Sequence, residues 1–515
     1  MPDAGLIIAL QQSQLFAHPI ERFVLIQTHI SWVLLTGPYA YKLRKPVNLG
    51  FLDFTTLEQR FHDCCQELQL NRRFSPELYI GLIHIGGTLD RPRLTRVDPG
   101  QRFDPTALDY AVQMLQFPQQ QLLSQRQSLP EQALLTLAQE LAHIHASAPN
   151  APTDATFGSP ESIYAPMQQN FEQIRPYLHS PKQQTQLQRL QLLTESEFQQ
   201  HTTLLEERHQ QGAIRECHGD LHLGNIALHR GRACPFDCIE FNPRYRWIDP
   251  LSDLAFLLMD LQLRDHHALS NRILNRYLEQ NLDYHALPLL RLYQAYRALV
   301  RAKITLLTSG CSTEPLAAPA AKQYQAYVDL ADQILTPVKA SLILMHGSSG
   351  SGKSWLSQQL VAQGHWIRLR SDQLRQHWDQ HTPELPRYSQ QMNDITYQRL
   401  LEEAESLLRA GLSIIIDAAF LNQAQRQPFL RLAQQLNIEP VIICCAATAA
   451  KQAHRITQRL RSGKDPSEAT VAVLRSQQTL YEPLTPEERR HAVTLDTADS
   501  DQVKDCLAQF APAFK

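Results

Sequence analysis

A phosphate-binding pattern at residues 347–354 constrains the fold of this chain more than any other feature of the sequence. It matches G-x-x-x-x-G-K-[ST] at every fixed position, and its residues are Gly347, Ser348, Ser349, Gly350, Ser351, Gly352, Lys353 and Ser354. The apolar run 341–345 before it predicts a buried strand, and residues 355–362 after it predict a helix. Backbone N–H groups in such a loop converge on phosphate oxygens, and the helix N-terminus adds its positive dipole. The pattern therefore predicts a nucleoside triphosphate site between a strand and a helix.

The last two residues of this pattern carry most of its chemistry. We expect Lys353 to reach the outer phosphates and the Ser354 hydroxyl to be a ligand for Mg²⁺. The alternative is a Gly/Ser-rich turn that simply joins a strand to a helix. Because every fixed position and both flanking elements are present, the triphosphate site is the favoured interpretation.

Composition and charge restrict the class of protein around this site. The 515 residues predict two to four domains, and 43% apolar with 19% charged residues suits ordinary globular cores. A formal net charge of −2 gives no overall basic field for nucleic acid or an anionic membrane. No apolar run approaches the roughly 18 residues of a membrane span, and the N-terminus shows no secretory signal. Nine cysteines form no disulfide framework, so we expect a cytoplasmic protein with no membrane partner.

Apolar periodicity divides the chain near residue 338. Up to about residue 117 short strands surround one helix; the strands are expected at 23–26, 32–35 and 40–43, and the helix at 56–74. The next part is mostly helical, with helices expected at 134–144, 289–307 and 324–335 and a strand pair at 226–228 and 236–239. Strands then alternate with helices, and these strands are expected at 341–346, 366–369, 413–416 and 440–445. Such alternation predicts a doubly wound parallel sheet with a nucleotide at the carboxyl ends of its strands.

A second group of polar residues lies at 218–225, in the sequence HGDLHLGN. Asp220 is followed five residues later by Asn225, and the expected strand pair after it ends in Asp237 and Glu240. In phosphoryl transfer a carboxylate accepts the proton of the attacking hydroxyl, while an amide oxygen and a second carboxylate hold Mg²⁺ against the phosphates. The spacing therefore indicates a phosphoryl-transfer site.

The segment around Asp220 resembles the catalytic loop His-Gly-Asp-x-x-x-x-Asn of the aminoglycoside phosphotransferase and choline kinase group. The resemblance covers most of residues 20–300. It implies a bilobal, protein-kinase-like fold in residues 1–338, with an N-lobe to about 117 and a C-lobe from about 118. It also implies that Asp220 is the catalytic base and that Asn225 is a metal ligand.

Further residues in the same region resemble this family. Lys42 resembles the N-lobe lysine that holds the α- and β-phosphates, and Glu67 resembles its partner on a helix. Asp253 resembles a structural aspartate that ties the catalytic loop to the following helix. Glu240 stands where the family usually has an aspartate, so either Glu240 or Asp237 is expected as the second metal ligand.

The catalytic region also carries a Cys/His cluster that offers an alternative. Its members are Cys217, His218, His222, Cys234 and Cys238. Their His-x₃-His and Cys-x₃-Cys spacings are tolerable for zinc, but a zinc site would leave Asp220 and Asn225 without a role. A second alternative is a degraded kinase-like fold that binds nucleotide without turnover, and the retained base and metal residues argue against it.

Polar residues after the phosphate-binding pattern indicate the rest of a second site. Asp372 and Arg375 resemble the Ser-Asp-x-x-Arg segment of P-loop kinases that act on small molecules or polynucleotide ends, which implies a place near the acceptor. Asp417 ends an apolar strand, as in the Walker B layout, where the carboxylate supports Mg²⁺. A helix cap at Asp372 and an ordinary strand end at Asp417 are the alternatives.

Three arginines at 455–461 form a basic cluster before Gly463 and Asp465. On a helix Arg455 and Arg459 share a face. In related kinases a lid brings arginines to the transferring phosphoryl group, because their planar donors spread its charge. Arg459 is therefore the predicted catalytic arginine, and a solvated basic face that includes Arg461 is the alternative.

Both resemblances together are typical of one bacterial group, which fuses an aminoglycoside phosphotransferase-like domain to an AAA-type P-loop kinase domain. They imply domains at 1–338 and 339–515, ATP and Mg²⁺ as cofactors, and γ-phosphoryl transfer to hydroxyl groups of small-molecule acceptors at one site per domain. An ATP-binding regulatory protein and a polynucleotide 5′-end kinase are the alternatives. Nucleic acid is not favoured as a partner, because the sequence has no basic stripe interleaved with aromatic residues.

Overall fold

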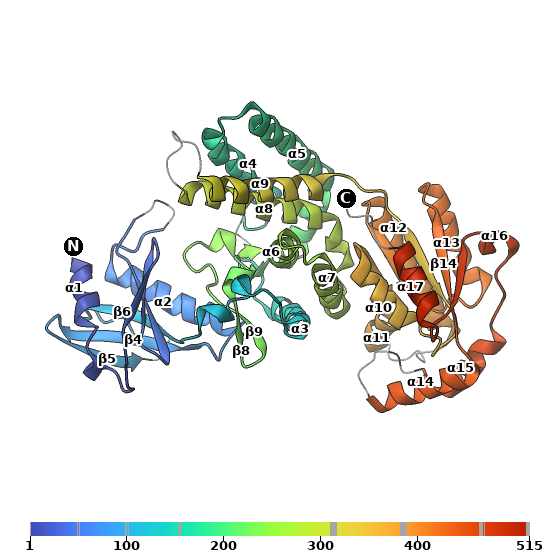
Figure 1. Cartoon of the computed structure of the whole chain (residues 1–515), viewed down its shortest axis with the longest axis horizontal. Helices are drawn as coiled ribbons and strands as arrows, with labels where there is room; N and C mark the ends of the chain where they lie inside the picture. Colours follow the sequence, from blue (N-terminus) through green and yellow to red (C-terminus); the bar gives the residue numbers. More distant parts are fainter. Residues whose placement is uncertain are drawn as a thin grey trace. The chain divides into compact units, whose positions relative to one another are not determined.

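The computed structural model describes residues 2–48, 50, 52–97, 100, 102–152, 156–309, 317–381, 389–462, 467 and 469–510. The chain forms two compact units (Figure 1). The first consists of Met1–Asp260 and Lys303–Ala317, and the second of Leu261–Ala302 and Ala318–Lys515. The second unit thus includes a helical segment that precedes the domain boundary expected at 338/339. Within the described ranges, every helix is too short or too polar to cross a bilayer.

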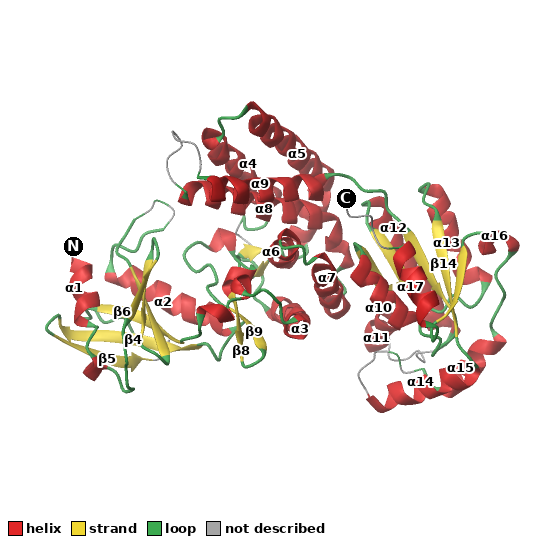
Figure 2. Ribbon diagram, viewed as in Figure 1, coloured by secondary structure: helices red, strands yellow, loops and turns green. Residues whose placement is uncertain are grey.

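A six-stranded antiparallel sheet forms the N-terminal part of the first unit (Figure 2). Its strands are β1 (Val24–Gln27), β2 (Ser31–Leu35), β3 (Tyr39–Arg44), β4 (Tyr79–Thr88), β5 (Arg91–Val97) and β6 (Asp109–Leu115), in the order β1-β2-β3-β6-β4-β5. Helix α2 (Leu57–Arg72) begins after Thr56, whose side chain accepts a hydrogen bond from the Gln59 N–H. The helix packs against β4 and β6, where Leu68 and Leu82 share one core.

Helices form most of the rest of the first unit. The α-helices are α1 (Pro2–Ala9), α3 (Glu131–Ser147), α4 (Pro160–Ile174), α5 (Pro181–Gln210) and α6 (Pro250–Leu263). The 3₁₀ turns are η1 (Ser13–Leu15), η2 (Gln119–Gln121), η3 (Leu123–Gln125), η4 (Arg175–Tyr177), η5 (Leu223–Asn225) and η6 (Pro243–Tyr245). Two small antiparallel pairs are β7 (Arg215–Glu216) with β10 (Trp247–Ile248), and β8 (Ile226–His229) with β9 (Arg232–Pro235). The catalytic loop, residues 218–225, lies between β7 and β8.

The hairpin after the catalytic loop ends earlier than predicted. β9 is Arg232–Pro235, so the strand expected at 236–239 was wrong. Asp237 has a φ of 63°, in the left-handed region that a strand does not contain. The Cys238 N–H donates to the Asn71 side chain at 2.9 Å. The apolar residues of this segment therefore reflect burial against α2 and not strand pairing.

A five-stranded parallel sheet is the centre of the second unit. Its strands are β11 (Leu342–His346), β12 (Trp366–Arg370), β13 (Ser413–Asp417), β14 (Pro440–Ala446) and β15 (Ala492–Asp496), in the order β12-β13-β11-β14-β15. The predicted doubly wound parallel sheet is confirmed, although β15 was not predicted. The chain leaves β11 toward β12 on one side and later returns to β14 on the other. This reversal of strand order is the place where such folds bind ligands.

Helices surround this sheet. They are α10 (Lys353–Gln363), α11 (Ser371–His381), α12 (Gln390–Arg409), α13 (Gln423–Gln435), α14 (Ala449–Ser462), α15 (Val471–Thr479), α16 (Pro486–Arg489) and α17 (Ser500–Gln509). The segment before the sheet adds α7 (His267–Asn281), η7 (Tyr284–Leu289), α8 (Leu290–Thr308) and α9 (Ala318–Leu335). On one face of the sheet, Leu356 of α10 and Val503 of α17 share a core with Ile343 and Ile415. This packing fixes α10 directly behind the loop that follows β11.

Candidate active sites

Asp220 and Asn225 lie side by side in the catalytic loop. The Asn225 Nδ2 donates to the Asp220 Oδ2 at 2.8 Å, which leaves the Asn225 Oδ1 as the atom suited to a metal ion. The His222 Nε2 lies 3.4 Å from the same Asp220 oxygen. Because the His222 Nδ1 accepts from the Gly224 N–H at 3.0 Å, the neutral imidazole carries its proton on Nε2, facing Asp220. His222 was predicted only as a member of the zinc alternative, and its contact with Asp220 was not predicted.

The buried Asp253 side chain of α6 holds the backbone that carries Asp220. Asp253 accepts hydrogen bonds from the His218 N–H at 3.0 Å and from the Gly219 N–H at 2.8 Å. Gly219 has a φ of 86°, and a Cβ there would lie 2.6 Å from the Tyr245 carbonyl oxygen. Only glycine fits such a turn without strain. These contacts match the tying role that the family resemblance implies for Asp253.

Lys42 of β3 links the antiparallel sheet to the segment after the hairpin. Its Nζ donates to the Glu67 Oε1 of α2 at 2.8 Å and also to the Asp237 carboxylate. Burial disfavours the charge of Lys42, but Asp237 and Glu67 raise its pKa above the usual range. Partial burial opposes the ionisation of Asp237 and so does Asp220, but Lys42 and Arg44 hold the pKa of the Asp237 carboxyl below its usual value. Lys42 and Asp237 are therefore a charged pair near the catalytic carboxylate.

Arg44 lies two residues after Lys42 on the same face of β3, and only 1% of its side chain is exposed. Its guanidinium donates to the Glu67 Oε2 at 2.7 Å, and it also donates to Asp63 and Glu240. Glu67 thus pairs with both cations of β3. No role was predicted for Arg44, although side chains two residues apart on a strand lie on the same face, which could have indicated one.

Glu240 and Asp237 occupy different surroundings. Glu240 belongs to the buried ion cluster around Arg44, with 3% of its side chain exposed. Burial raises the pKa of Glu240 to about 8, against the effect of Arg44. The Asp237 side chain is 47% exposed beside Lys42, so solvent and ions can reach it. Of the two candidates that the sequence left open, the geometry favours Asp237 as a metal ligand.

The Cys/His residues of the zinc alternative do not come together. The Cys234 thiol points to the Glu77 carboxylate, with Sγ 3.2 Å from Oε1. Among the described residues, one group of three has the spacing of metal ligands, and it consists of His145, Cys217 and Asp253. Its carboxylate already accepts a hydrogen bond from the His145 Nε2 at 3.2 Å, besides those from the catalytic loop. Hydrogen bonding thus accounts for this group.

Three glycines shape the loop between β11 and α10. Gly347, Gly350 and Gly352 have φ angles of 139°, 78° and 98°. A Cβ at Gly350 would lie 2.6 Å from the Gln452 carbonyl oxygen, and one at Gly352 would lie 2.6 Å from the Thr497 Oγ1. Both the backbone conformation and the close approach therefore favour glycine. Because α10 begins directly after Gly352, the loop presents the N-terminus of a helix to a phosphate group.

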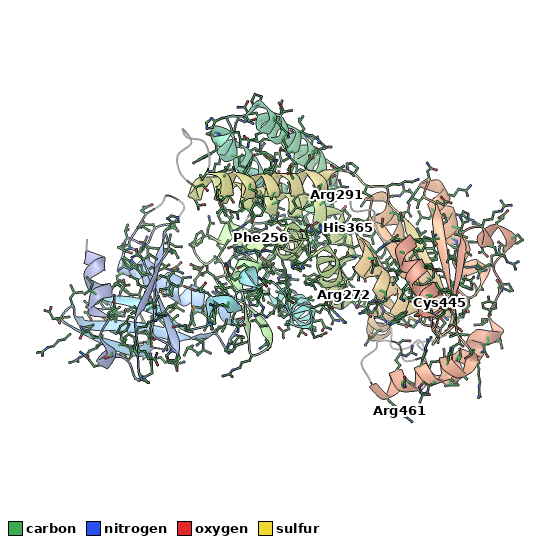
Figure 3. All side chains as sticks on the ribbon, in the orientation of Figure 1. Phe256, Arg272, Arg291, His365, Cys445 and Arg461 are labelled. Carbon is green, nitrogen blue, oxygen red and sulfur yellow. The ribbon has the colours of Figure 1, made fainter. Side chains whose placement is uncertain are left out.

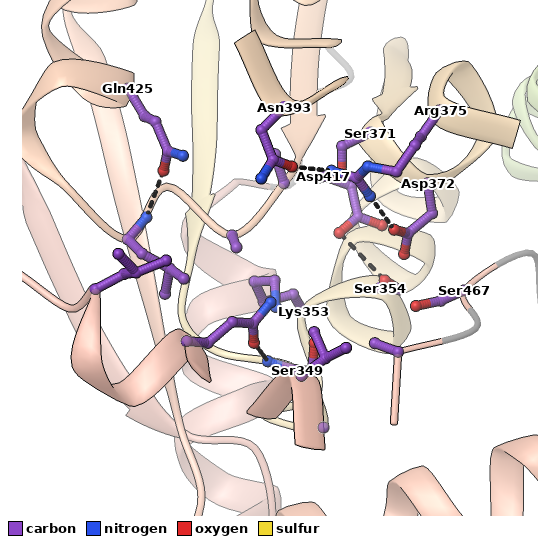
Figure 4. Close-up of a pocket in the computed structure, with 18 of the residues that line it drawn as sticks. Ser349, Lys353, Ser354, Ser371, Asp372, Arg375, Asn393, Asp417, Gln425 and Ser467 are labelled. Atoms are coloured by element: carbon purple, nitrogen blue, oxygen red, sulfur yellow. Dashed lines mark hydrogen bonds and ion pairs between the residues drawn. The ribbon is translucent and has the colours of Figure 1, made fainter. Parts of the chain in front are cut away.

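Ser354 of α10 faces Asp417 at the end of β13 (Figure 4). The Ser354 Oγ donates to the Asp417 Oδ1 at 3.2 Å, and the Ser357 Oγ donates to the Oδ2 at 3.2 Å. The Lys353 Nζ donates to the Ser348 carbonyl oxygen at 3.0 Å, and burial lowers the pKa of Lys353. A serine hydroxyl and a carboxylate are hard oxygen donors that suit Mg²⁺. The structure thus brings together the pair of residues predicted as metal ligands in this unit.

A cavity of about 300 Å³ lies over the phosphate-binding loop. Asp372 and Arg375 of α11 line it, and the Arg375 Nη1 donates to the Asp372 Oδ1 at 2.8 Å (Figure 4). Arg375 also donates to the Asn393 Oδ1 at 3.2 Å. Burial alone would raise the pKa of Asp372, but Arg375 and a hydrogen bond from Ser467 contribute to holding it below its usual value. An ionised carboxylate in the cavity wall can accept the proton of a hydroxyl group.

Two of the three clustered arginines line the same cavity. Arg455 donates to the Gly350 carbonyl oxygen at 3.2 Å, and Arg459 donates to the Ala469 carbonyl oxygen at 2.8 Å. Arg461 is exposed in the last turn of α14 (Figure 3). The neighbouring Gly463 and Asp465, which the sequence analysis named with this cluster, lie outside the described residues.

Gln477 of α15 is a cavity residue that the sequence analysis missed. Its Oε1 accepts a hydrogen bond from the Ser349 N–H at 2.8 Å, so it contacts the phosphate-binding loop directly. No motif connects α15 to the loop in the sequence. Only the packing of the second unit brings the two together.

Two segments of the chain match family models. Residues 108–291 match the phosphotransferase enzyme family, and residues 342–484 match a family described as an AAA domain. Uncharacterized proteins of Mycobacterium tuberculosis and Mycobacterium bovis are 28% identical over 477 residues, which is 90% of this chain and 92% of each relative. The fusion that the sequence resemblances implied is thereby confirmed.

Two solved structures are similar to this chain over part of its length. A choline/ethanolamine kinase family protein from Mesorhizobium loti is 13% identical and covers 64% of this chain and 98% of its own, with a TM-score of 0.38. A gluconokinase from Sinorhizobium meliloti is 17% identical and covers 33% of this chain and 93% of its own, with a TM-score of 0.26. The two family matches support a kinase-type phosphotransferase that uses ATP.

Proposed function

We propose that this chain, which joins a phosphotransferase-family segment to an AAA-domain segment, is a bifunctional ATP-dependent phosphotransferase. Each site transfers the γ-phosphoryl group of ATP to a hydroxyl group of a small-molecule acceptor. One observation carries the proposal: each unit gathers a carboxylate that can accept a proton, oxygen ligands for Mg²⁺, and a lysine. These residues are Asp220, Asn225, Asp237 and Lys42 in the first unit, and Asp372, Ser354, Asp417 and Lys353 in the second.

In the first site Asp220 accepts the proton of the acceptor hydroxyl as the oxygen attacks the γ-phosphorus. Lys42, oriented by its contact with Glu67, binds the α- and β-phosphates. Asn225 and Asp237 would hold Mg²⁺ through an amide oxygen and a carboxylate. When bound there, the ion would neutralise charge on the β- and γ-phosphates.

In the second site the phosphate-binding loop and Lys353 hold the triphosphate. Ser354 and Asp417, which already contact each other at 3.2 Å, would hold Mg²⁺. Asp372, whose pKa is held below its usual value so that the carboxylate is ionised, accepts the proton of the acceptor. Arg459, which also lines the cavity, stabilises the charge of the transferring group.

The acceptors are small hydroxyl compounds in this proposal. A cavity of about 300 Å³ in the second unit is at the lower end of the range for small-molecule sites. Nucleic acid is the less favoured acceptor, and the proposal includes no membrane partner. We place the protein in the cytoplasm, where buried thiols such as those of Cys64 and Cys217 stay reduced.

The test is a screen of a metabolite extract with γ-labelled ATP and the full chain. Two single variants, Asp220→Asn and Lys353→Ala, each silence one site. We expect labelled products that disappear with one variant and persist with the other. A 5′-hydroxyl oligonucleotide is included as a separate acceptor. Loss of ATP without any labelled product would contradict the proposal and favour an ATP-binding regulator, and label on the oligonucleotide alone would contradict the small-molecule acceptor.

A further inference from the structure

Helix α7 belongs to two different parts of this chain. In the sequence its residues, His267–Asn281, lie inside the segment 108–291 that matches the phosphotransferase family. In the structure they lie in the second compact unit, which contains the phosphate-binding loop. There α7 packs against α10 and β12. The phosphotransferase-family segment therefore contributes a helix to the unit that carries the other site.

Two asparagines of α7 take the place of a neighbouring strand along β12, which is an edge strand of its sheet. The Asn275 Oδ1 accepts from the Arg368 N–H at 2.7 Å, and the Asn275 Nδ2 donates to the Trp366 carbonyl oxygen at 2.8 Å. The Asn271 Nδ2 donates to the Trp366 carbonyl oxygen at 3.2 Å. An edge strand otherwise exposes unpaired backbone groups. These contacts fix the register of α7 along β12.

Glu279, one turn further along α7, is the only acidic residue of this helix and is buried. It forms an ion pair with Arg368, and its Oε2 lies 4.0 Å from the Arg370 Nη1. Burial opposes the ionisation of Glu279, but Arg368 and Arg370 hold its pKa below the usual value. A buried carboxylate thus balances two buried arginines of β12.

Both arginines that face Glu279 also contact the residues that would hold Mg²⁺. The Arg368 Nη1 donates to the Ser354 carbonyl oxygen at 3.2 Å. The Arg370 Nε lies 3.7 Å from the Asp417 Oδ2. Glu279 is therefore linked to Ser354 through Arg368 and to Asp417 through Arg370.

The charges in this network explain why a carboxylate is needed there. Two buried guanidinium groups next to a divalent cation would repel it, and Arg370 could turn fully onto Asp417. Removing one partner of a buried ion pair leaves the other charge uncompensated. Glu279 draws both arginines toward α7, so that the Asp417 carboxylate stays directed at the Ser354 hydroxyl.

We propose that Glu279 of α7 is a positioning residue for the Mg²⁺–nucleotide site of the second unit, acting through Arg368 and Arg370 on Ser354 and Asp417. The proposal rests on the proposed function of that site as an ATP site. It also means that residues 339–515 do not contain every residue that shapes the site. The phosphotransferase-family segment supplies part of its support.

The test measures binding of a fluorescent ATP analogue to the full chain as a function of Mg²⁺ concentration. All proteins carry Lys42→Ala, which weakens nucleotide binding at the first site. The part of the signal that is lost when Lys353→Ala is added is assigned to the second site. The half-exposed Trp355 in the cavity wall serves as a fluorescence energy donor for the analogue. We expect Glu279→Gln to raise the Mg²⁺ midpoint at least about tenfold, the lower range for loss of an outer-shell partner. Binding of the analogue in EDTA should stay near the parent value.

Control variants separate positioning from a general loss of structure. Glu402→Gln makes the same chemical change at an exposed position of α12 and should leave the Mg²⁺ midpoint unchanged. The double variant Glu279→Gln/Arg368→Met removes the ion pair as a whole, which buried pairs tolerate better than loss of one partner. It should recover only part of the Mg²⁺ dependence, because Arg370 still lacks its carboxylate partner. If Glu279→Gln does not fold, the double variant alone is compared with the parent, and an unchanged Mg²⁺ midpoint overturns the proposal.

Other outcomes are equally decisive. If Glu279→Gln folds but binds the ATP analogue equally more weakly with Mg²⁺ and in EDTA, its role is merely structural and the inference is overturned. An unchanged Mg²⁺ midpoint would also overturn it while leaving the ATP site intact. If the parent shows no binding that depends on Lys353, the proposed function of the second site fails instead.

Discussion

The two sites draw their residues from the chain in different ways. In the second unit, the phosphate-binding groups come from consecutive residues at 347–354, at the start of one helix. In the first unit, Lys42 comes from β3, Glu67 from α2, and Asp237 from the segment after β9. One site is built mainly from backbone N–H groups, whereas the other is built from ion pairs between distant side chains.

This difference has consequences for how each site fails. A backbone cradle keeps its shape when one side chain is removed, so a substitution should remove one contact. A buried ion cluster shares its charges, so removal of one member leaves others uncompensated. The ion cluster of the first site should therefore be more sensitive to single charge changes and to pH than the phosphate-binding cradle of the second.

The largest effect is expected at the catalytic carboxylate of the first site. Asp220→Asn keeps the shape of the side chain but removes the base. In a Lys353→Ala background, we expect phosphoryl transfer by the first site to fall at least about a hundredfold. ATP binding, measured by calorimetry on the same protein, should persist. Transfer of γ-label at the rate of the background protein would rule out Asp220 as the base.

The second largest effect concerns the lysine of the phosphate-binding loop. Lys353→Ala removes a charge-assisted contact that contributes about 1.5–3 kcal/mol. Affinity of the second site for ATP should fall about ten- to a hundredfold. Lys353→Arg is the matched control, because it keeps the charge but not the shape. Equal ATP affinity before and after Lys353→Ala in a Lys42→Ala background would contradict this role.

A third substitution pair separates the metal ligand from the ion cluster in the first site. We expect Asp237→Asn to raise the Mg²⁺ concentration for half-maximal transfer at least about tenfold, as loss of a metal-site partner does. Glu240→Gln should change it much less, because Glu240 contacts Arg44 and is buried. Mg²⁺ titrations of transfer in a Lys353→Ala background measure both. A larger shift for Glu240→Gln would reverse the assignment.

A fourth prediction concerns the pH dependence of stability rather than catalysis or binding. The pKa of Glu240 is raised from 4.5 to about 8 in the fold, so between these values the folded state binds more protons than the unfolded state. This contribution to stability is present below pH 4.5 and is lost as pH rises through about 8. Glu240→Gln cannot lose a proton, so its stability relative to the unsubstituted protein should increase with pH.

Urea midpoints of the first unit at several pH values between 5 and 8 measure this slope. Glu21→Gln, an exposed change in the same unit, is the control and should run parallel to the unsubstituted protein. A Glu240→Gln curve that is parallel as well would mean that Glu240 is already ionised across this range.

In the second unit the strands with mostly buried residues were predictable, including the edge strand β12, and the half-exposed edge strand β15 was not. The predicted strands of the second unit read as continuous apolar runs, as in β13 (Ser413–Asp417), because helices cover both faces. β15 (Ala492–Asp496) lies at the edge and is half-exposed, so its pattern is weak. In the first unit β5 (Arg91–Val97) was missed for the same reason, since most of its side chains are polar and exposed.

The sequence by itself determined those features in which neighbouring residues act together. These features are the loop at 347–354, the Asp220–Asn225 spacing and the α/β alternation. Each depends on local geometry, which residues close together in the sequence determine. The tertiary structure decided the partners. That Asp237 faces Lys42, that Glu240 is buried against Arg44, and that Glu279 supports the second site follow from contacts across many residues. Such contacts depend on burial and charge balance in three dimensions, and no spacing in the sequence encodes them.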